Sequence, residues 1–428
     1  MGATDIQRTV SAVWRIESAR LVGAVARMVG GVGMAEEFAQ DALLAAMEQW
    51  PRDGIPDNPA AWLMTAAKRR AIDHLRRGDL IDRKHAEFAR HTPDAHHDAD
   101  NDTPVDDDRL RLIFIACHPV VPAEGRIALT LRLLGGLTTQ EIARAFLSTE
   151  STIAQRIVRA KKTLADAHVP FEAPSSDAIA ERLPAVLEVV YLIFNEGYSA
   201  TAGSQLLRPE LCEEALRLGR TLAQLLPHKA EVSGLAALME LQASRLRARV
   251  DASGAPVLLA DQDRSRWDRL LIRRGLIALA RALRLSTQRG RYVLQAEIAA
   301  CHARSLSVDA TDWRRVAELY WELLDIDPSP VVELNRAMAV AMAYGAEAGL
   351  VIVDHLRGEP ALQDYALLAG ARGDLLERLG RHDEARTEFE RAGALSSNEK
   401  EREPMLARAR KQPANALVAS NRSARIPQ

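Results

Sequence analysis

The segment from Thr138 to Leu164, TTQEIARAFLSTESTIAQRIVRAKKTL, constrains the fold of this chain more than any other stretch. Its pattern predicts a helix-turn-helix, with a short first helix, a tight turn near Leu147-Ser148 and a longer second helix that ends in basic residues. Such a motif places its second helix in the major groove of DNA, with its first turns on base edges and its basic end on phosphates. Because helical cores of other function share this shape, the motif alone does not establish DNA binding.

The second helix of this motif carries side chains of the kinds that bind DNA. Glutamine and arginine pair bidentately with the edges of adenine and guanine, and lysine and arginine hold phosphates. Each residue taken singly also fits an ordinary solvated surface, but together they indicate DNA contact. The residues expected to contact DNA are Ser151, Thr152, Gln155, Arg156, Arg159, Lys161 and Lys162.

A second basic helix is predicted well upstream of the first. It begins at Asn58, a favourable N-cap, with Pro59 at the first helical position. An aromatic ring at the head of a basic stripe suits melting DNA, because arginines hold phosphates while the ring stacks on an unpaired base. The alternatives are a core tryptophan and a solvated arginine face. The residues of this predicted surface are Trp62, Lys68, Arg69, Arg70, Asp73, Arg76 and Arg77.

The helix predicted over residues 35–50 has two distinct faces. Apolar residues recur at intervals of three and four, which predicts a buried stripe. Glu37, Asp41, Leu44 and Glu48 lie on another face, because their spacing is i, i+4, i+7 and i+11. Carboxylates around an exposed leucine form a plausible docking surface for a basic partner helix. An ordinary solvated face is the alternative.

Bulk composition is that of a globular protein. The chain has 428 residues, 47% of them hydrophobic and 27% charged, which is typical of about two to four domains. The net charge of −2 argues against an indiscriminate nucleic-acid binder, so positive charge is local. The three cysteines are far apart and lack metal-ligand spacing, and no apolar run is long enough for a signal or membrane segment. We therefore expect a cytoplasmic protein with no membrane contact, metal or cofactor.

Periodicity predicts an all-α protein in several parts. Acidic residues greatly outnumber basic ones after the second basic helix, which indicates a solvated linker there. The predicted parts are a helical domain at 8–78, the acidic linker at 79–108, a helical domain with the helix-turn-helix at 109–170, a helical extension domain at 178–285, helical repeats at 286–410 and a disordered tail at 411–428.

The end of the chain resembles a tetratricopeptide repeat. The segment 365–392 has small residues at the expected helix crossings and a turn at Gly380-Arg381, and its closing Leu395 is echoed by Ile326, 69 residues earlier. That separation is about two periods of 34 residues. Helix pairs of this type stack into a concave surface that binds peptides or docks on a neighbouring domain. For residues 178–285, where no period is evident, an irregular helical bundle is the alternative.

The order of these parts resembles that of bacterial sigma-70 family factors of the extracytoplasmic-function (ECF) type. Residues 35–77, AEEFAQDALLAAMEQWPRDGIPDNPAAWLMTAAKRRAIDHLRR, resemble region 2 of that family, and residues 109–165 resemble region 4. The resemblance covers about residues 10–168. It implies an RNA polymerase sigma factor that binds core polymerase, recognises −35 and −10 promoter elements and helps to open the DNA.

The resemblance also implies roles for the surfaces described above. The helix at 62–77, with the loop at 51–58, would recognise the −10 element and capture a flipped base, and residues 151–162 would read the duplex −35 element. The implied polymerase contacts are the β′ clamp and the β flap. The implied polymerase-binding residues are Glu37, Gln40, Asp41, Leu44 and Glu48.

The full length resembles a narrower group, the sigma factors with a tetratricopeptide-like C-terminal extension. The segments 190–198, VYLIFNEGY, and 258–267, LLADQDRSRW, look like signatures of that group, but Ala116 stands where the group usually has a second cysteine beside Cys117. A dithiol or metal role at that point is therefore doubtful. The resemblance implies that the extension is required for activity and replaces a separate anti-sigma protein.

The second signature contains a charged cluster before a long helix. We expect it to cap that helix and to hold the extension against the sigma domains or against another part of itself, by charge-assisted hydrogen bonds. A catalytic or phosphate-binding cluster is the alternative. The residues of this extension motif are Asp261, Asp263, Arg264, Arg266 and Trp267.

Two other classes of protein compete with this interpretation. No phosphate-binding, metalloprotease, nucleophile-elbow or CxxC motif is present, which argues against an enzyme. A helix-turn-helix activator with a ligand- or peptide-sensing repeat domain would explain residues 109–428. It would leave the basic helix at 58–77 without a role.

Overall fold

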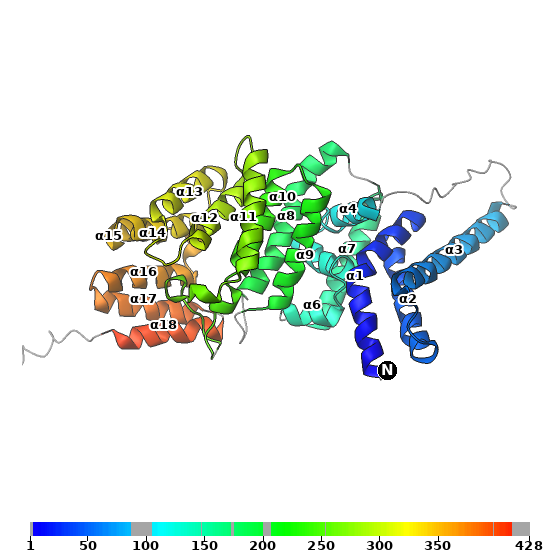
Figure 1. Ribbon diagram of the computed structural model, residues 1–428, viewed down its shortest axis with the longest axis horizontal. Coiled ribbons are helices and arrows are strands. Elements are labelled where there is room, and N and C mark those ends of the chain that lie inside the picture. The colour runs from blue at the N-terminus through cyan, green and yellow to red at the C-terminus, as the bar shows by residue number, and fades with distance from the viewer. Residues whose placement is uncertain are drawn as a thin grey trace, which may run out of the picture. The chain divides into compact units, whose positions relative to one another are not determined.

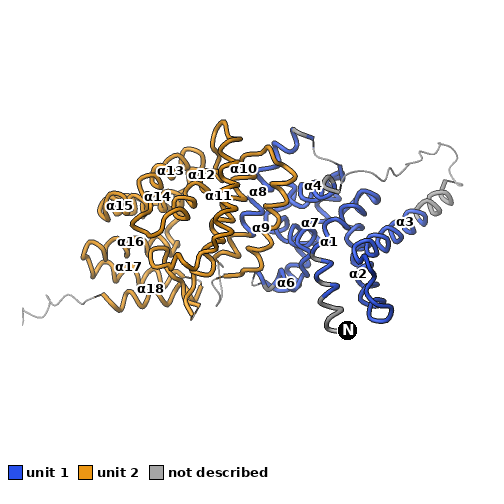
Figure 2. Tube along the Cα trace, viewed as in Figure 1, with its two compact units in different colours: residues 1–193 blue, residues 194–428 orange. Residues whose placement is uncertain are grey.

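The computed structural model describes residues 3–86, 105–146, 148–172, 175–199, 207–252, 254–396 and 398–412. The chain divides into two compact units, residues 1–193 and 194–428 (Figures 1 and 2). Within these described ranges the regular elements are helices, and isolated β-bridges, such as that between Val250 and Pro256, form no strand. The prediction of an all-α fold is therefore confirmed.

The first unit begins with three helices packed on one another. They are α1 (Ala3–Val29), α2 (Val32–Asp53) and α3 (Pro59–Ala86). Gly30 ends α1 with φ +71°, and Gly54 ends α2 with φ +87°, a backbone region in which a side chain would be strained. Asn58 accepts a hydrogen bond from the amide of Ala61 at 3.0 Å, so the predicted N-cap of α3 is confirmed.

The second part of this unit is built from shorter helices. They are α4 (Val105–Ala116), α5 (Ala123–Leu133), α6 (Thr139–Ala145) and α7 (Glu150–Asp166). The predicted helix-turn-helix is thus present as α6 and α7, although Leu147 of its turn lies outside the described residues. Leu129, Ile142 and Ile153 are fully buried between α5, α6 and α7. Helix α8 (Ser176–Tyr198) follows, and the boundary between the units falls within it.

The second unit is a succession of helices that pack mainly on their neighbours in the sequence (Figure 1). Its first half contains α9 (Pro209–Leu225), α10 (Ala230–Ala243), the short 3-10 helices η1 (Leu246–Ala248), η2 (Leu259–Asp261) and η3 (Arg264–Arg266), and α11 (Arg269–Leu285). Its second half contains α12 (Arg291–Arg304), α13 (Trp313–Ile326), α14 (Pro330–Tyr344), α15 (Ala346–Leu356), η4 (Pro360–Leu362), α16 (Ala366–Arg378), α17 (His382–Leu395) and α18 (Glu399–Lys411).

Helix α10 is the centre of the first half. It is buried along nearly its whole length and packs on α9, α11 and α12. The approach to α11 is close, because a Cβ on Gly275 would lie 2.6 Å from the side chain of Leu241. The second half has two further cores, one over α12–α14 and one over α14–α18.

The structure bears on the predicted organisation only in part. The helical C-terminal domain is confirmed, whereas its resemblance to tetratricopeptide repeats remains a prediction. Helix covers both ends of the predicted linker, 79–86 and 105–108, and its middle lies outside the described residues. The predicted tail after residue 412 also lies outside them. No helix in the described ranges combines the length and the apolar character that crossing a bilayer requires.

Candidate nucleic-acid interface

Local hydrogen bonds fix the start of both helices of the helix-turn-helix. The Thr138 amide donates to the Glu141 carboxylate at 2.8 Å, and the Glu141 amide donates to the Thr138 hydroxyl at 3.1 Å, which is a reciprocal capping box before α6. Thr149 caps α7 by accepting from the Thr152 amide at 3.1 Å. These caps set where α7 begins and therefore which side chains its first turn presents.

Most predicted DNA-contacting residues of α7 lie on its solvent side. Ile153, Ile157, Ala160 and Leu164 are buried and form the inner side of the helix. The residues on the solvent side, exposed or partly exposed, are Ser151, Thr152, Gln155, Arg156, Arg159 and Lys162. The predicted polar front of α7 is thus a single accessible surface.

Lys161 lies elsewhere, in an ion pair with Glu36 of α2. Glu36 is only 3% exposed, and its other carboxylate oxygen lies 2.6 Å from the Arg132 guanidinium of α5. Burial alone would raise the pKa of Glu36, but the positive charges of Lys161 and Arg132 hold it below its usual value. This carboxylate is therefore ionised at neutral pH and joins α2 to α5 and α7.

A second contact connects the same two parts of the first unit. Asp108 of α4 is buried and pairs with Arg111 at 3.3 Å and with Arg27 of α1 at 3.8 Å. Gly23 of α1 lies directly against it, since a Cβ there would be 3.1 Å from the Asp108 side chain. Sequence reasoning identified neither Glu36 nor Asp108, because the contacts that join separate helices, such as those to Lys161 and Arg27, are made to residues far away in the sequence.

The predicted polymerase-binding face of α2 is accessible. Glu37, Asp41, Leu44 and Glu48 are exposed, with Leu44 at 57%, whereas Gln40 is partly buried and donates a hydrogen bond to Glu36. The apolar side of the helix ends in Trp50, which is 2% exposed. Carboxylates around an exposed leucine thus form one continuous face.

The predicted basic surface of α3 is also accessible. Arg69, Asp73, Arg76 and Arg77 are exposed, and Lys68 and Arg70 are partly exposed. Arg70 lies 3.7 Å from Asp41 of α2, so the acidic and basic faces adjoin.

Trp62 lies at the head of this surface and is partly buried. Its ring meets that of Trp50 edge to face, with 5.6 Å between centroids. A cavity of about 270 Å³ also lies at the start of α3, lined by residues of α1 and by Asn58, Ala61 and Thr65 but not by Trp62. The structure therefore places a ring and a hollow at the same end of the basic stripe.

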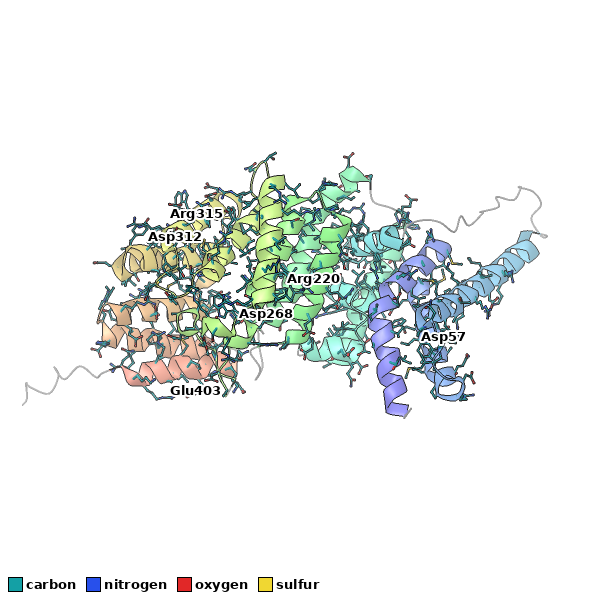
Figure 3. The ribbon with its side chains drawn as sticks, in the orientation of Figure 1. Asp57, Arg220, Asp268, Asp312, Arg315 and Glu403 are labelled. Atoms are coloured by element: carbon teal, nitrogen blue, oxygen red, sulfur yellow. The ribbon has the colours of Figure 1, made fainter. Side chains whose placement is uncertain are left out.

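The charged residues of the extension motif have different structural roles: one caps a helix, one donates buried hydrogen bonds, and others are exposed. Asp263 accepts from the Ser265 amide at 2.9 Å and starts η3. Asp268, which is labelled in Figure 3 and which sequence reasoning missed, caps α11 by accepting from the Leu270 and Leu271 amides. Arg264 is buried and donates to the carbonyls of His302 and Ser305 at 2.7 and 2.8 Å. Asp261 and Arg266 remain exposed.

The two signature segments of the extension meet at Arg245. Its guanidinium donates to the Tyr198 hydroxyl at 2.7 Å and lies 5.7 Å from the centre of the Trp267 ring. Trp267 is 3% exposed, and Gly197 approaches Cys212 so closely that a Cβ would be 2.7 Å from its amide. Gly197, Tyr198 and Trp267 therefore serve packing within the second unit.

Cys117 has the environment of a structural thiol. It is buried, lies 3.4 Å from the Thr130 hydroxyl, and has its pKa raised to about 11 by burial. The thiol is thus protonated at neutral pH. In the part of the chain that the structure describes, no group of three or more His, Cys, Asp or Glu side chains is arranged to hold a metal ion.

Comparison with known proteins matches three segments of the chain. Sigma-70 region 2 matches residues 15–80, sigma-70 region 4 matches residues 111–164, and a family of unknown function, DUF6596, matches residues 182–283.

The matched relatives include one of the same length class and several shorter ones. The uncharacterized protein R00370 of Rhizobium meliloti (strain 1021) is 45% identical over 393 residues, covering 89% of this chain and 90% of that protein. A probable ECF RNA polymerase sigma factor, SigI of Mycobacterium tuberculosis, is 31% identical over 169 residues, covering 37% of this chain and 56% of SigI. The ECF RNA polymerase sigma factor SigK of Mycobacterium ulcerans is 29% identical over 142 residues, covering 32% of this chain and 74% of SigK.

Proposed function

The chain belongs to the sigma-70 family of RNA polymerase sigma factors, in its ECF group, and from that membership we propose that it directs core polymerase to promoters with paired −35 and −10 elements. The observation that carries this proposal is the pair of accessible basic helix faces, on α3 and on α7, in segments that match regions 2 and 4. The chain itself would supply positioning and strand capture, and the polymerase would supply the chemistry.

The face of α2 would bind the polymerase. Glu37, Asp41 and Glu48 surround the exposed Leu44, an arrangement that complements a basic helix with an apolar contact point, here the clamp helices of the β′ subunit. Gln40 lies beside them. The region 4 part would approach the β flap.

The basic stripe of α3 would hold the −10 element as it opens. Arginines along the helix would bind phosphates of the non-template strand, and Trp62 would stack on an unpaired base. The cavity of about 270 Å³ beside Asn58 is large enough for one extruded base, and extruding a base costs a few kcal/mol, least at a weakly stacked step. Base capture there would couple strand opening to sequence recognition.

Helix α7 would read the −35 element as duplex. Gln155 and Arg156 would reach base edges from the middle of the helix, and Arg159 and Lys162 would contact the backbone near its end. Ser151 and Thr152 hydroxyls lie at the capped start, where a phosphate would bind.

The extension, residues 178–428, would regulate this activity and take the place of a separate anti-sigma protein. A chain truncated after Tyr198, which keeps α8 whole, should lose promoter-specific transcription, because we expect the extension to be required for activity. Unchanged transcription by the truncated chain would refute this role.

The activator alternative is less well supported, because it leaves the region 2 match without a function. The experiment that separates the two is promoter binding by the purified chain with and without core polymerase, followed by in vitro transcription. If the chain is a sigma factor, specific start sites appear only when the chain and core polymerase are both present. Specific duplex binding by the chain alone, with no effect on where core polymerase starts, would support the activator.

A further inference from the structure

Helix α11 has an unusual charge pattern that the functions above do not use. Its sequence, RLLIRRGLIALARALRL, has five arginines and no acidic residue. All five side chains are exposed. We call Arg269, Arg273, Arg274, Arg281 and Arg284 the arginine face.

Helical geometry gathers these side chains on one side. Since each residue turns the helix by about 100°, the five positions fall within an arc of about 140°. Ile272, Gly275, Leu279 and Ala282 are buried on the opposite side, where α11 packs on α10. From Arg269 to Arg284 the face extends about 22 Å along the helix.

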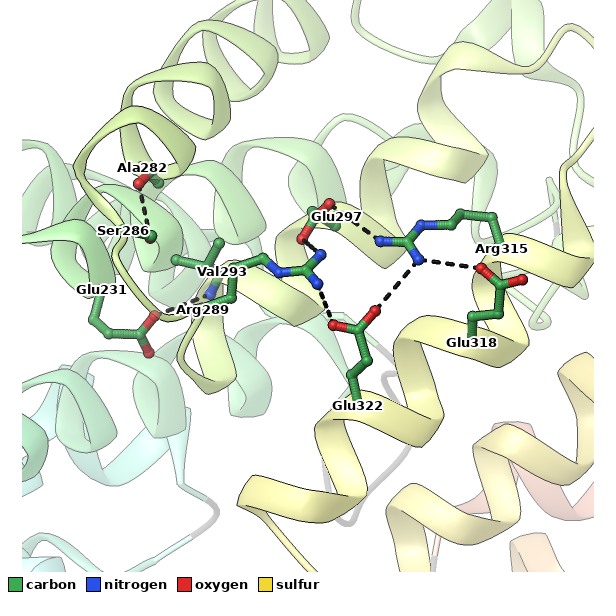
Figure 4. A network of polar contacts seen from close by, with 9 residues as sticks. All are labelled: Glu231, Ala282, Ser286, Arg289, Val293, Glu297, Arg315, Glu318 and Glu322. Carbon is green, nitrogen blue, oxygen red and sulfur yellow. Dashed lines mark hydrogen bonds and ion pairs between the residues drawn. The ribbon is translucent and has the colours of Figure 1, made fainter.

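The charge of this face is not neutralised locally. Elsewhere in the second unit arginines bind carboxylates: Arg289 lies between Glu297 and Glu322, and Arg315 contacts Glu318 at 3.1 Å (Figure 4). None of the five guanidinium groups of the arginine face forms an ion pair with a described carboxylate. A row of unpaired arginines on a rigid helix favours a partner with repeated negative charge.

An open cleft of about 690 Å³ continues the positive surface at the start of α11. Arg247 and Arg266 line it together with Arg269, and both are exposed. The carboxylate in its wall, Asp268, already accepts hydrogen bonds from two amides of α11. Trp267 also lines the cleft, is 3% exposed, and has an indole N–H with no partner among the described groups.

We propose that the arginine face and the adjoining cleft bind the phosphate backbone of duplex DNA. Arginine forks match phosphate oxygens bidentately, and a straight face of this length spans several successive phosphates. Leu270 and Ile277, which are 57% and 61% exposed within the same arc, would contact sugars between them. The choice of DNA over an acidic protein rests on the proposed function, which brings promoter duplex to this chain.

The test compares two full-length variants of equal charge. One carries Arg269→Gln, Arg273→Gln, Arg281→Gln and Arg284→Gln. The control carries Arg378→Gln, Arg381→Gln, Arg386→Gln and Arg410→Gln, at four ion-paired arginines of which Arg386 is partly exposed and the other three are exposed. Binding to a random-sequence duplex of about 30 base pairs is measured by fluorescence anisotropy between about 50 and 200 mM salt.

The proposal predicts that the arginine-face variant binds at least about tenfold more weakly, with a salt slope smaller by about 0.9 for each phosphate that the variant no longer neutralises. The control variant should keep both values, and replacing the same four residues by lysine should restore most of the affinity. Unchanged affinity of the arginine-face variant would assign the face to another partner, such as an acidic protein, and would overturn the proposal. An equal loss of affinity in the control would overturn it too.

This result is separable from the sigma-factor function. With core polymerase, the arginine-face variant should retain the wild-type start sites and the wild-type ranking of −35 sequences, because its contacts carry no base information. If core polymerase with the wild-type chain produced no specific start sites, the function proposed above would be contradicted. The proposed contact between the arginine face and the DNA backbone would not be affected by that result.

Discussion

At the residue scale, Glu36 shows how one buried carboxylate can organise a functional unit. It is almost fully buried, yet two cations from distant helices keep it ionised. A buried ion pair adds little net stability, but breaking it by removing one partner is costly. Lys161 and its neighbour Lys162 therefore make a matched pair for mutation.

Lys161→Met should destabilise the first unit by about 3 kcal/mol, because it leaves the Glu36 charge partly uncompensated in a buried site. Lys162→Met should cost at most about 1 kcal/mol, since its pair with Asp166 is mostly exposed. Amide hydrogen exchange of α2 and α7 measures both effects locally. Equal exchange in the two variants would show that the Glu36 contact does not hold these helices together.

His302 should make the stability of the second unit depend on pH. Burial, and then the charges of Arg245 and Arg264, lower its pKa to about 3. The folded state therefore keeps a neutral ring while the unfolded state gains a proton below pH 6.5, so stability falls as the pH drops from about 6.5 towards 3, by up to about 1.4 kcal/mol per pH unit.

The measurement is the urea midpoint of unfolding of wild-type chain and of His302→Phe between about pH 6.5 and pH 4.5. Phenylalanine keeps a ring against Trp313, whose centroid is 5.1 Å from that of His302, and removes the titration. The pH dependence should be weaker in the variant. The same slope in both proteins would exclude His302 as its source.

Local signals in the sequence were sufficient for some residues and not for others. The caps at Asn58 and Thr138 were predictable because their partners lie within three residues. Glu36 and Arg264 were not, because their roles depend on groups about 40 to 125 residues away in the sequence, such as Lys161 and His302. Asp268 had a local cap signal that was overlooked.

At the scale of the element, α7 should separate base contacts from backbone contacts. Gln155→Ala should cost about 1–3 kcal/mol at the preferred −35 sequence and relax discrimination at one base pair. Arg159→Ala should weaken binding to every sequence alike and reduce the salt slope by about 1. Competition among −35 variants for holoenzyme distinguishes the two patterns. A uniform loss for Gln155→Ala would remove it from base readout.

The sequence predicts where the helices lie better than it predicts which residues of other helices they contact. Apolar periodicity locates α2, α3 and α7, and N-caps at Asn58 and Thr149 also locate α3 and α7, because both signals are local in the sequence. The inward placement of Lys161 is different. It depends on a second helix that approaches α7 from that side.

At the scale of the whole molecule, we propose that two basic faces and one acidic face act together in a single promoter-binding protein. The order of region 2 and region 4 could be predicted because each segment resembles a known region, and the comparisons match both segments in that order. The packing of α4 on α1 could not, since it depends on the buried Asp108 and its partners rather than on any local pattern.

The most direct test of this account is strand opening by holoenzyme that carries Arg69→Gln, Arg70→Gln, Arg76→Gln and Arg77→Gln. Permanganate reactivity of −10 thymines reports opening, and co-purification with core polymerase confirms assembly. We expect the variant to assemble and still recognise the duplex −35 element, but to leave the −10 thymines unreactive. Wild-type permanganate reactivity would contradict it.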